Sequence, residues 1–215
     1  MSAADAGRLG VLGGTFDPVH VGHLALATYA RDAIGLERVV FVPAGIPPHK
    51  TDRPVTPAHH RLAMIELAVA DEPTFEVSRV EIDRPGPSYA ADTMTILADE
   101  ERASGRGREL YFILSSEAVA GLPRWHQPDR LLELCRLAVV PRRGVGMPQR
   151  AWIEEHFAGR EDRFLALAGP DLPVSASQIR RIAAAGGSLE GLVPPVVERY
   201  IVEHALYTRA VWRTN

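Results

Sequence analysis

The sequence predicts an α/β protein built on a single doubly wound, mostly parallel sheet. Segments with strand-like and helix-like hydrophobic patterns alternate along the 215 residues, as they do where helices cover both faces of a parallel sheet. The run Arg38–Pro43 contains an unbroken apolar stretch, which is typical of a strand buried on both faces. Gly13 and Gly14 follow the first apolar run and precede the first helical pattern, as expected for a tight connection between strand and helix.

The first half of the chain is predicted to alternate strand and helix from its start. A strand at 9–12 leads to a helix at 22–34, and Gly35 is placed to end that helix. The strand at 38–43 then completes a β-α-β unit. The elements expected next are a helix that starts after Pro57 and runs through 64–68, a strand at 75–82, a helix at 90–101 and a strand at 110–114.

The second half continues the alternation and ends in helices. We expect short helical pieces near Val119 and Leu131, a strand at 137–140, a helix at 149–157, a short strand at 164–167, and helices at 176–185 and 195–206. No internal repeat and no linker divides the chain, so residues 1–215 are predicted to form one Rossmann-like domain with C-terminal helices and a flexible N-terminus over residues 1–8. Ligands of such sheets bind at the carboxyl ends of the strands.

Composition excludes several classes of partner. The 24 basic and 27 acidic residues leave no surplus of positive charge for a nucleic-acid backbone. No stretch approaches the roughly 20 apolar residues of a membrane-spanning helix, and the first residues lack the apolar core of a targeting segment. The single cysteine, Cys135, lies in an apolar run and cannot form an intrachain disulfide. We therefore expect a cytoplasmic protein without a nucleic-acid or membrane partner; a homo-oligomer is compatible with the sequence.

The stretch from Gly13 to His23 carries the densest functional signals. It lies between the first strand and the first helix, where glycines let the backbone approach an anion and a helix N-terminus attracts negative charge. His20 and His23 share a face if the helix begins near His20, and both can donate hydrogen bonds to phosphoryl oxygens. Taken singly, the glycines also fit an ordinary tight turn, and the histidines fit a structural or zinc-binding role. Together these residues favour a phosphate site.

The contiguous pattern narrows the class of protein. The Gly-x-Gly-x-x-Gly and Walker patterns are absent, which disfavours a dehydrogenase or a P-loop enzyme. The pattern Gly-Gly-Thr-Phe-Asp-Pro-x-His-x-Gly-His instead resembles the signature of the nucleotidylyltransferase superfamily, and residues 174–180 resemble its second motif. That second segment also makes sense unaided as a capped helix. Ser175 is placed as the N-cap, Ser177 follows in the first turn, and Arg180 can form a bidentate fork with phosphate.

Three further segments resemble bacterial nicotinate mononucleotide adenylyltransferase. Pro47-Pro48-His49-Lys50 matches a loop near the acceptor's phosphate in that family. The segment 87–93 resembles one that recognises the nicotinate carboxylate, and 122–126 resembles one in which an indole, here that of Trp125, stacks on the pyridine ring.

The sequence departs from the family pattern at two places. Ala90 replaces a threonine, which removes a side-chain contact to the acceptor. Ser115-Ser116-Glu117 stands where the family has Gly-x-Asp, whose acid contacts the ribose; the longer Glu117 can still accept from ribose hydroxyls. Arg142 and Arg143 follow the next strand, as a family basic pair does near the adenosine, although a solvated charge pair fits equally well.

The resemblance implies an enzyme that transfers the AMP half of ATP to nicotinate mononucleotide, giving deamido-NAD and pyrophosphate. It also implies Mg2+ held mainly by the ATP phosphates, without protein metal ligands. The implied catalytic residues are Thr15, His20, His23 and Arg180. The implied ATP-binding residues are Gly13, Gly14, Thr15, Phe16, His20, His23, Glu117, Arg143, Ser175, Ser177 and Arg180. The implied acceptor-binding residues are Asp17, His49, Lys50, Ser88, Tyr89 and Trp125.

Three alternatives are weighed against this function. A phosphopantetheine adenylyltransferase shares the histidine motif, but the chain length and the segments of Tyr89 and Trp125 favour a pyridine nucleotide. A non-catalytic nucleotide sensor would keep the pocket and bind without releasing pyrophosphate. A fragment of a class I tRNA synthetase is disfavoured because the chain is short and acidic.

Overall fold

The computed structural model describes residues 7–48, 54–142, 144–169 and 173–208. Within these ranges, six strands form one sheet in the order β3-β2-β1-β4-β5-β6, and every neighbouring pair is parallel. The strands are β1 (Arg8–Gly14), β2 (Arg38–Pro43), β3 (Phe75–Val77), β4 (Glu109–Ser115), β5 (Arg136–Val140) and β6 (Phe164–Ala166). The predicted doubly wound α/β fold is confirmed, and β1 begins at Arg8, inside the segment expected to be a flexible N-terminus.

The helices follow the predicted alternation. They are α1 (Val21–Ile34), α2 (Ala58–Val69), α3 (Val80–Asp83), α4 (Ala90–Ala103), α5 (Ser116–Ala120), α6 (Pro128–Leu134), α7 (Arg150–His156), α8 (Ala176–Ala184) and α9 (Pro195–Glu203), with 3-10 turns η1 (Leu122–Arg124) and η2 (Glu161–Arg163). Gly35 ends α1 in the predicted left-handed conformation, with φ of 71°. None of the helices in the described ranges is long and apolar enough to cross a membrane.

The strand predicted at 75–82 is wrong beyond Val77. The ladder ends where the Ser78 N–H donates to the Phe41 carbonyl, and the chain then turns into α3. Val77 and Val80 are three residues apart, so the two-residue alternation of a strand is lost between them. The helix predicted to reach residue 206 also ends earlier, at Glu203, because Ala205 and Tyr207 adopt positive φ values of 49° and 61°.

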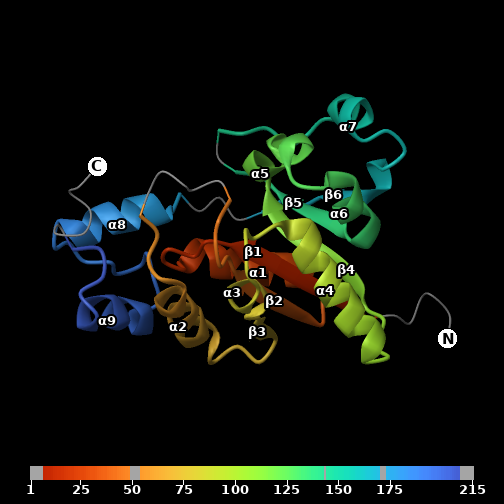
Figure 1. Ribbon diagram of the computed structural model, residues 1–215. Coiled ribbons are helices and arrows are strands. Elements are labelled where there is room, and N and C mark those ends of the chain that lie inside the picture. Colours follow the sequence, from red (N-terminus) through yellow and green to blue (C-terminus); the bar gives the residue numbers. More distant parts are fainter. Residues whose placement is uncertain (1–6, 49–53, 143, 170–172, 209–215) are drawn as a thin grey trace.

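Two apolar cores lie on the two faces of the sheet. One core joins alternate strand residues such as Phe41 and Ile113 to α1, α2, α8 and α9. The other joins the intervening residues, such as Val40 and Phe112, to α4, α6 and α7. Figure 1 shows α2, α8 and α9 grouped at one end of the molecule and α5, α6 and α7 at the other. The continuous apolar runs read from the sequence therefore serve both faces at once.

The strand order reverses between β1 and β4. The chain passes from β1 to β2 through α1 on one face, and from β4 to β5 through α6 on the other face. The connections that follow β1 and β4 therefore diverge, and a crevice opens at the carboxyl ends of these strands.

Gly45, just after β2, lies at this edge and packs closely against the backbone of Glu81. A Cβ at this position would overlap the backbone carbonyl oxygen of Glu81. We expect Gly45→Ala to destabilise the fold by about 1–3 kcal/mol, since backbone must shift to admit the methyl group. Urea unfolding measures this loss, with Gly146→Ala as the control because a Cβ there would meet no atom within 4 Å. Equal stability of the two variants would contradict the described packing.

Candidate active site

A cavity of about 520 Å³ opens at the carboxyl edge of the sheet. Its walls come from the β1–α1 connection, the ends of β4 and β5, and the start of α8. The lining includes these predicted site residues: Thr15, Phe16, Asp17, His20, His23, Ser175, Ser177 and Arg180. The structure therefore brings together two motifs that lie more than a hundred residues apart in the sequence.

The segment after β1 is held in an unusual backbone conformation. Phe16 is buried and has a φ of 50°, a left-handed value that is uncommon for a residue other than glycine. Its ring packs edge-on against His23 at a centroid distance of 4.9 Å. A Cβ on Gly14 would lie 3.1 Å from that ring. We expected the two glycines to admit an anion; the structure gives Gly14 a second reason, which is room for the Phe16 ring.

The two motif histidines lie against each other at the start of α1. His20 is the N-cap residue, and its ring stacks on that of His23 with centroids 3.6 Å apart. The His20 backbone N–H donates to His23 Nδ1 at 3.2 Å. Because Nδ1 accepts, the neutral His23 ring carries its proton on Nε2 and can donate it to a ligand. The predicted sharing of one face is confirmed.

Burial controls the charge of His20. Its pKa is lowered from 6.5 to about 4, first by burial and then by the positive charge of Arg142. His20 is therefore neutral at neutral pH in the free protein. It offers a hydrogen-bond donor and not a fixed cation, so the positive charge at this end of the cavity comes from Arg142.

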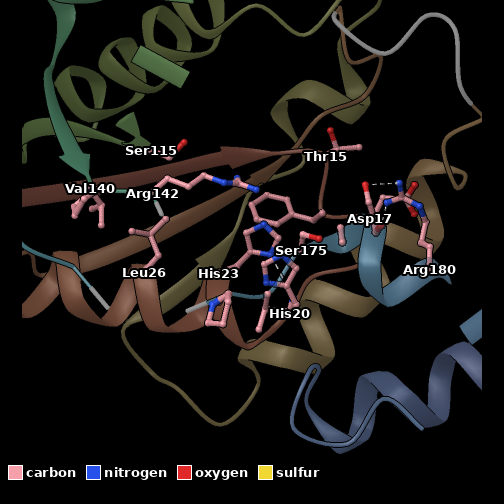
Figure 2. Close-up of a pocket in the computed structure, with 17 residues that line it drawn as sticks. Thr15, Asp17, His20, His23, Leu26, Ser115, Val140, Arg142, Ser175 and Arg180 are labelled. Carbon is pink, nitrogen blue, oxygen red and sulfur yellow. Dashed lines mark hydrogen bonds between the residues drawn. The ribbon is translucent and has the colours of Figure 1, made fainter. Parts of the chain in front are cut away.

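Arg142 lines the cavity on the side opposite Arg180 (Figure 2). Figure 2 shows the two arginines on either side of the histidine pair. Arg142 Nε forms an ion pair with Glu117 at 3.1 Å, and the Arg142 backbone N–H donates to Ser116 Oγ. Glu117, predicted to contact ribose, is half exposed and bound to Arg142 instead of lining the cavity. Arg143 lies outside the described residues.

The start of α8 presents donors to the same cavity. Ser175 is the N-cap as predicted, with its Oγ accepting from the Gln178 N–H at 3.2 Å. Arg180 Nη1 donates to the Asp17 carbonyl at 2.6 Å, and Nη2 donates to Ser177 Oγ at 3.2 Å. The guanidinium is thereby held at the cavity wall beside the segment that follows β1, which the sequence predicts to bind phosphate (Figure 2).

Asp17 is buried and its carboxylate is already bound on both oxygens. Oδ1 accepts from the Tyr207 hydroxyl at 2.8 Å, and Oδ2 accepts from the Thr56 N–H at 3.3 Å. Asp17 is the one carboxylate among the described lining residues. In the part of the chain that the structure describes, no group of three His, Cys, Asp or Glu side chains is placed to hold a metal ion. The polar part of the described lining thus consists of one carboxylate among hydroxyls, histidines and arginines.

Comparison with known sequences supplies the family. The cytidylyltransferase-like family model matches residues 11–182. A Dehalococcoides mccartyi protein named "Probable nicotinate-nucleotide adenylyltransferase" is 40% identical over 206 residues, covering 94% of this chain and 98% of its own. A Thermomicrobium roseum protein of the same name is 43% identical over 200 residues, covering 93% and 91%. The chain belongs to the nicotinate-nucleotide adenylyltransferase family.

Comparison with solved structures supports the fold. The nicotinic acid mononucleotide adenylyltransferase of Plasmodium falciparum, solved in complex with NaAD, superposes with a TM-score of 0.73 over 94% of this chain and 97% of its own. The sequence identity is 16%. The parallel sheet of this chain is thus the architecture found in that adenylyltransferase.

The segments that resemble the acceptor site of the adenylyltransferase family meet beside the end of β2. Ser88 Oγ accepts from the Gly45 N–H, and the Ser88 N–H donates to the Ile46 carbonyl, both at 2.9 Å. Tyr89 stacks on His126 with centroids 4.3 Å apart. Half-buried Trp125, the neighbour of His126, packs edge-on against Phe112. His49 and Lys50 lie outside the described residues.

Sequence reasoning missed three residues of this region. Arg142 was interpreted only as one of a basic pair near the adenosine, His126 only as the end of the segment 122–126, and Arg61 was not considered. Arg61 lies in α2 and is 1% exposed, with its guanidinium bound to backbone carbonyls around the cavity. In the sequence, Arg61 stands between two histidines and an apolar run. That pattern shows only that the arginine, if buried, needs polar partners, and it does not show which ones.

The lowered pKa of His20 predicts acid sensitivity. Between pH 6.5 and about 4, His20 binds a proton in the unfolded chain but not in the folded chain. Stability present above pH 6.5 is therefore lost as the pH falls, by up to about 3 kcal/mol from this group. We expect His20→Gln to lose less stability between about pH 7 and about pH 4.5 than the wild type. Urea unfolding at both pH values measures it. Exposed His126→Gln is the control, and an unchanged acid loss in His20→Gln would contradict the assignment.

Proposed function

We propose that the protein transfers the adenylyl group of MgATP to the 5′-phosphate of nicotinate mononucleotide, forming nicotinate adenine dinucleotide and pyrophosphate. The observation that carries the proposal is the meeting of the histidine pair of α1 with the N-terminus of α8 in one cavity. The curated relatives at 40% and 43% identity are named for this activity. The site beside β2 supplies stacked aromatic rings suited to a flat cationic heterocycle.

The proposed chemistry is one displacement at phosphorus. A 5′-phosphate oxygen of the acceptor attacks the α-phosphorus of ATP in line. The bond from that phosphorus to the bridging oxygen breaks, and pyrophosphate leaves with the electron pair. Since the phosphate is already ionised, the protein needs no general base and acts by positioning and by stabilising charge.

The described residues suit separate parts of this reaction. His20 and His23 donate to the α-phosphoryl group and its bridging oxygen, where negative charge grows in the transition state. Thr15, Ser175, Ser177 and Arg180 bind the β- and γ-phosphates, supported by the free N–H groups at the start of α8. An anion beside His20 would favour its protonated form, so binding of the polyphosphate opposes the effect of burial on its pKa.

Mg2+ enters as part of the nucleotide substrate in this proposal. Both oxygens of Asp17 accept hydrogen bonds from the protein, so the described lining offers cations and donors to the phosphates rather than ligands to a metal. The ion would neutralise charge on the polyphosphate. We place the reaction, which uses soluble nucleotides, in the cytoplasm.

The acceptor side is proposed from the aromatic residues and the serine beside β2. Trp125 would stack on the pyridine ring, with Tyr89 and Ser88 beside it, and Asp17, His49 and Lys50 stay predictions for the acceptor's ribose and phosphate side. Ala90 is the first residue of α4, next to Tyr89. Its methyl group provides no hydrogen bond, so selectivity for the carboxylate would have to come from backbone groups or from other side chains of this site.

The function is tested by pyrophosphate release with MgATP and three acceptors in parallel. We expect turnover with nicotinate mononucleotide and much less with nicotinamide mononucleotide or phosphopantetheine, because donors that pair with a carboxylate are left poorly paired by an amide. Comparable use of both pyridine nucleotides would mean a relaxed acceptor pocket, as the lost side-chain contact at Ala90 would allow. Turnover only with phosphopantetheine would overturn the assigned acceptor. Nucleotide binding without turnover would make the protein a sensor.

The histidine pair gives the sharpest kinetic prediction. His20→Ala and His23→Ala should each lower kcat by on the order of 10²-fold or more, because one preorganised donor to the transition state is lost. His156→Ala, an exposed substitution on α7, is the control and should keep wild-type turnover. Steady-state kinetics with both substrates measures the effect. Wild-type activity in either variant of the pair would remove that histidine from the mechanism.

A further inference from the structure

Arg61 binds three backbone positions in two loops around the site, the β1–α1 connection and the β2–α2 connection. Its side chain projects from α2 and is the largest among the fully buried side chains of the described residues. Nε donates to the Thr56 carbonyl at 2.8 Å, Nη1 to the Thr15 carbonyl at 2.8 Å, and Nη2 to the Gly45 carbonyl at 3.3 Å. One rigid planar group thus fixes three backbone positions at once.

The three residues whose carbonyls bind Arg61 make different contacts in the site. Thr15 lines the cavity that we assign to ATP. Gly45 is bound through its N–H to Ser88, on the side that we assign to the acceptor. Thr56 holds Asp17 through its N–H. The guanidinium therefore connects the donor side to the acceptor side by single hydrogen bonds.

Burying the charged Arg61 side chain costs free energy of desolvation. Burial lowers its pKa, and the nearby charge of Asp17 and Glu81 acts in the opposite direction. A buried cation is retained only where partners compensate its lost hydration, and here most partners are backbone carbonyls of loops. A core that needed only volume at this point would be better served by an apolar side chain.

We propose that Arg61 is a positioning residue that sets the donor loop at Thr15 and the acceptor loop at Gly45 at a fixed separation. The inference rests on the proposed function for its kinetic consequence. In-line attack requires both substrates in register, and a misplacement of about 1 Å can lower a rate by on the order of 10²-fold. Binding of either substrate alone requires only its own loop. Loss of Arg61 therefore lowers turnover more than it weakens either binding step.

The test compares Arg61→Lys with the control Arg108→Lys. Lysine keeps the charge but cannot reach three carbonyls in one plane. Arg108 is also a buried arginine, with 8% of its side chain exposed, and it forms an ion pair with Glu101. It immediately precedes β4 and therefore lies at the edge of the sheet opposite the site. We expect kcat of Arg61→Lys to fall by on the order of 10²-fold, with a few-fold change in the Kd of MgATP and of nicotinate mononucleotide measured singly.

Amide hydrogen exchange supplies a readout that needs no turnover. In Arg61→Lys the amides near Thr15 and those near Gly45 should exchange faster together, whereas Arg108→Lys should leave both loops unchanged. In the wild type, a non-hydrolysable ATP analogue alone should slow exchange at residues 45–46 as well as near Thr15. Ala44 is left out because its N–H donates to the Gly14 carbonyl directly. This last measurement decides the proposal even if Arg61→Lys does not fold.

The outcomes separate this inference from the proposed function. Wild-type protein that releases no pyrophosphate with any acceptor would refute the function, and hydrogen exchange would still decide the role of Arg61. An active wild type with Arg61→Lys turnover within about twofold of it would overturn the inference, since a hundredfold loss is expected from misplacement. Faster exchange confined to α2, or a wild-type analogue effect confined to Thr15, would overturn it as well.

Discussion

The reversal of strand order between β1 and β4 is the constraint on which the site depends. Because β1 pairs with β2 on one side and β4 on the other, the connections after β1 and β4 leave on opposite faces of the sheet. The crevice between them cannot be filled by either connection. Into it project the histidine pair from α1, Ser115 from β4, Arg142 from the end of β5 and the start of α8. The parallel register puts all these strand ends at one edge, so residues far apart in the chain meet there.

Charge in this crevice is arranged by burial as much as by residue type. His20 is neutral at neutral pH because burial and Arg142 both disfavour its protonation. Asp17, the acid of the described lining, accepts from Tyr207 and Thr56 on its two oxygens and so is turned toward the protein. The other polar groups that line the cavity are hydroxyls, histidines and arginines, and the Asp17 carboxylate is hydrogen-bonded to the protein on both oxygens. Preorganised donors of this kind stabilise developing charge without rearrangement during the reaction.

The sequence predicted what is local and missed what is set by distant contacts. The elements around the site followed from hydrophobic pattern and caps, as with Gly35 at the end of α1 and Ser175 at the start of α8. The strand at 75–82 failed because the apolar residues Val80 and Ile82 suggest continued pairing, whereas the ladder had ended at Ser78. No local pattern announces that Arg61 binds Thr15, 46 residues away, or that Glu117 turns to Arg142. Such contacts depend on which strand ends become neighbours.

The longest of these contacts ties folding to the completion of the site. Tyr207 lies 190 residues from Asp17, yet its hydroxyl donates to the Asp17 carboxylate inside the core. It reaches that position because α9 stops at Glu203 and the chain takes two left-handed residues, Ala205 and Tyr207, to turn inward. Until this turn docks, the Asp17 carboxylate in the segment after β1 would lack the hydrogen bond that Tyr207 donates to one of its oxygens. The last described turn of the chain thus acts on the first loop of the sheet, and a competent cavity requires the C-terminal helices to be in place.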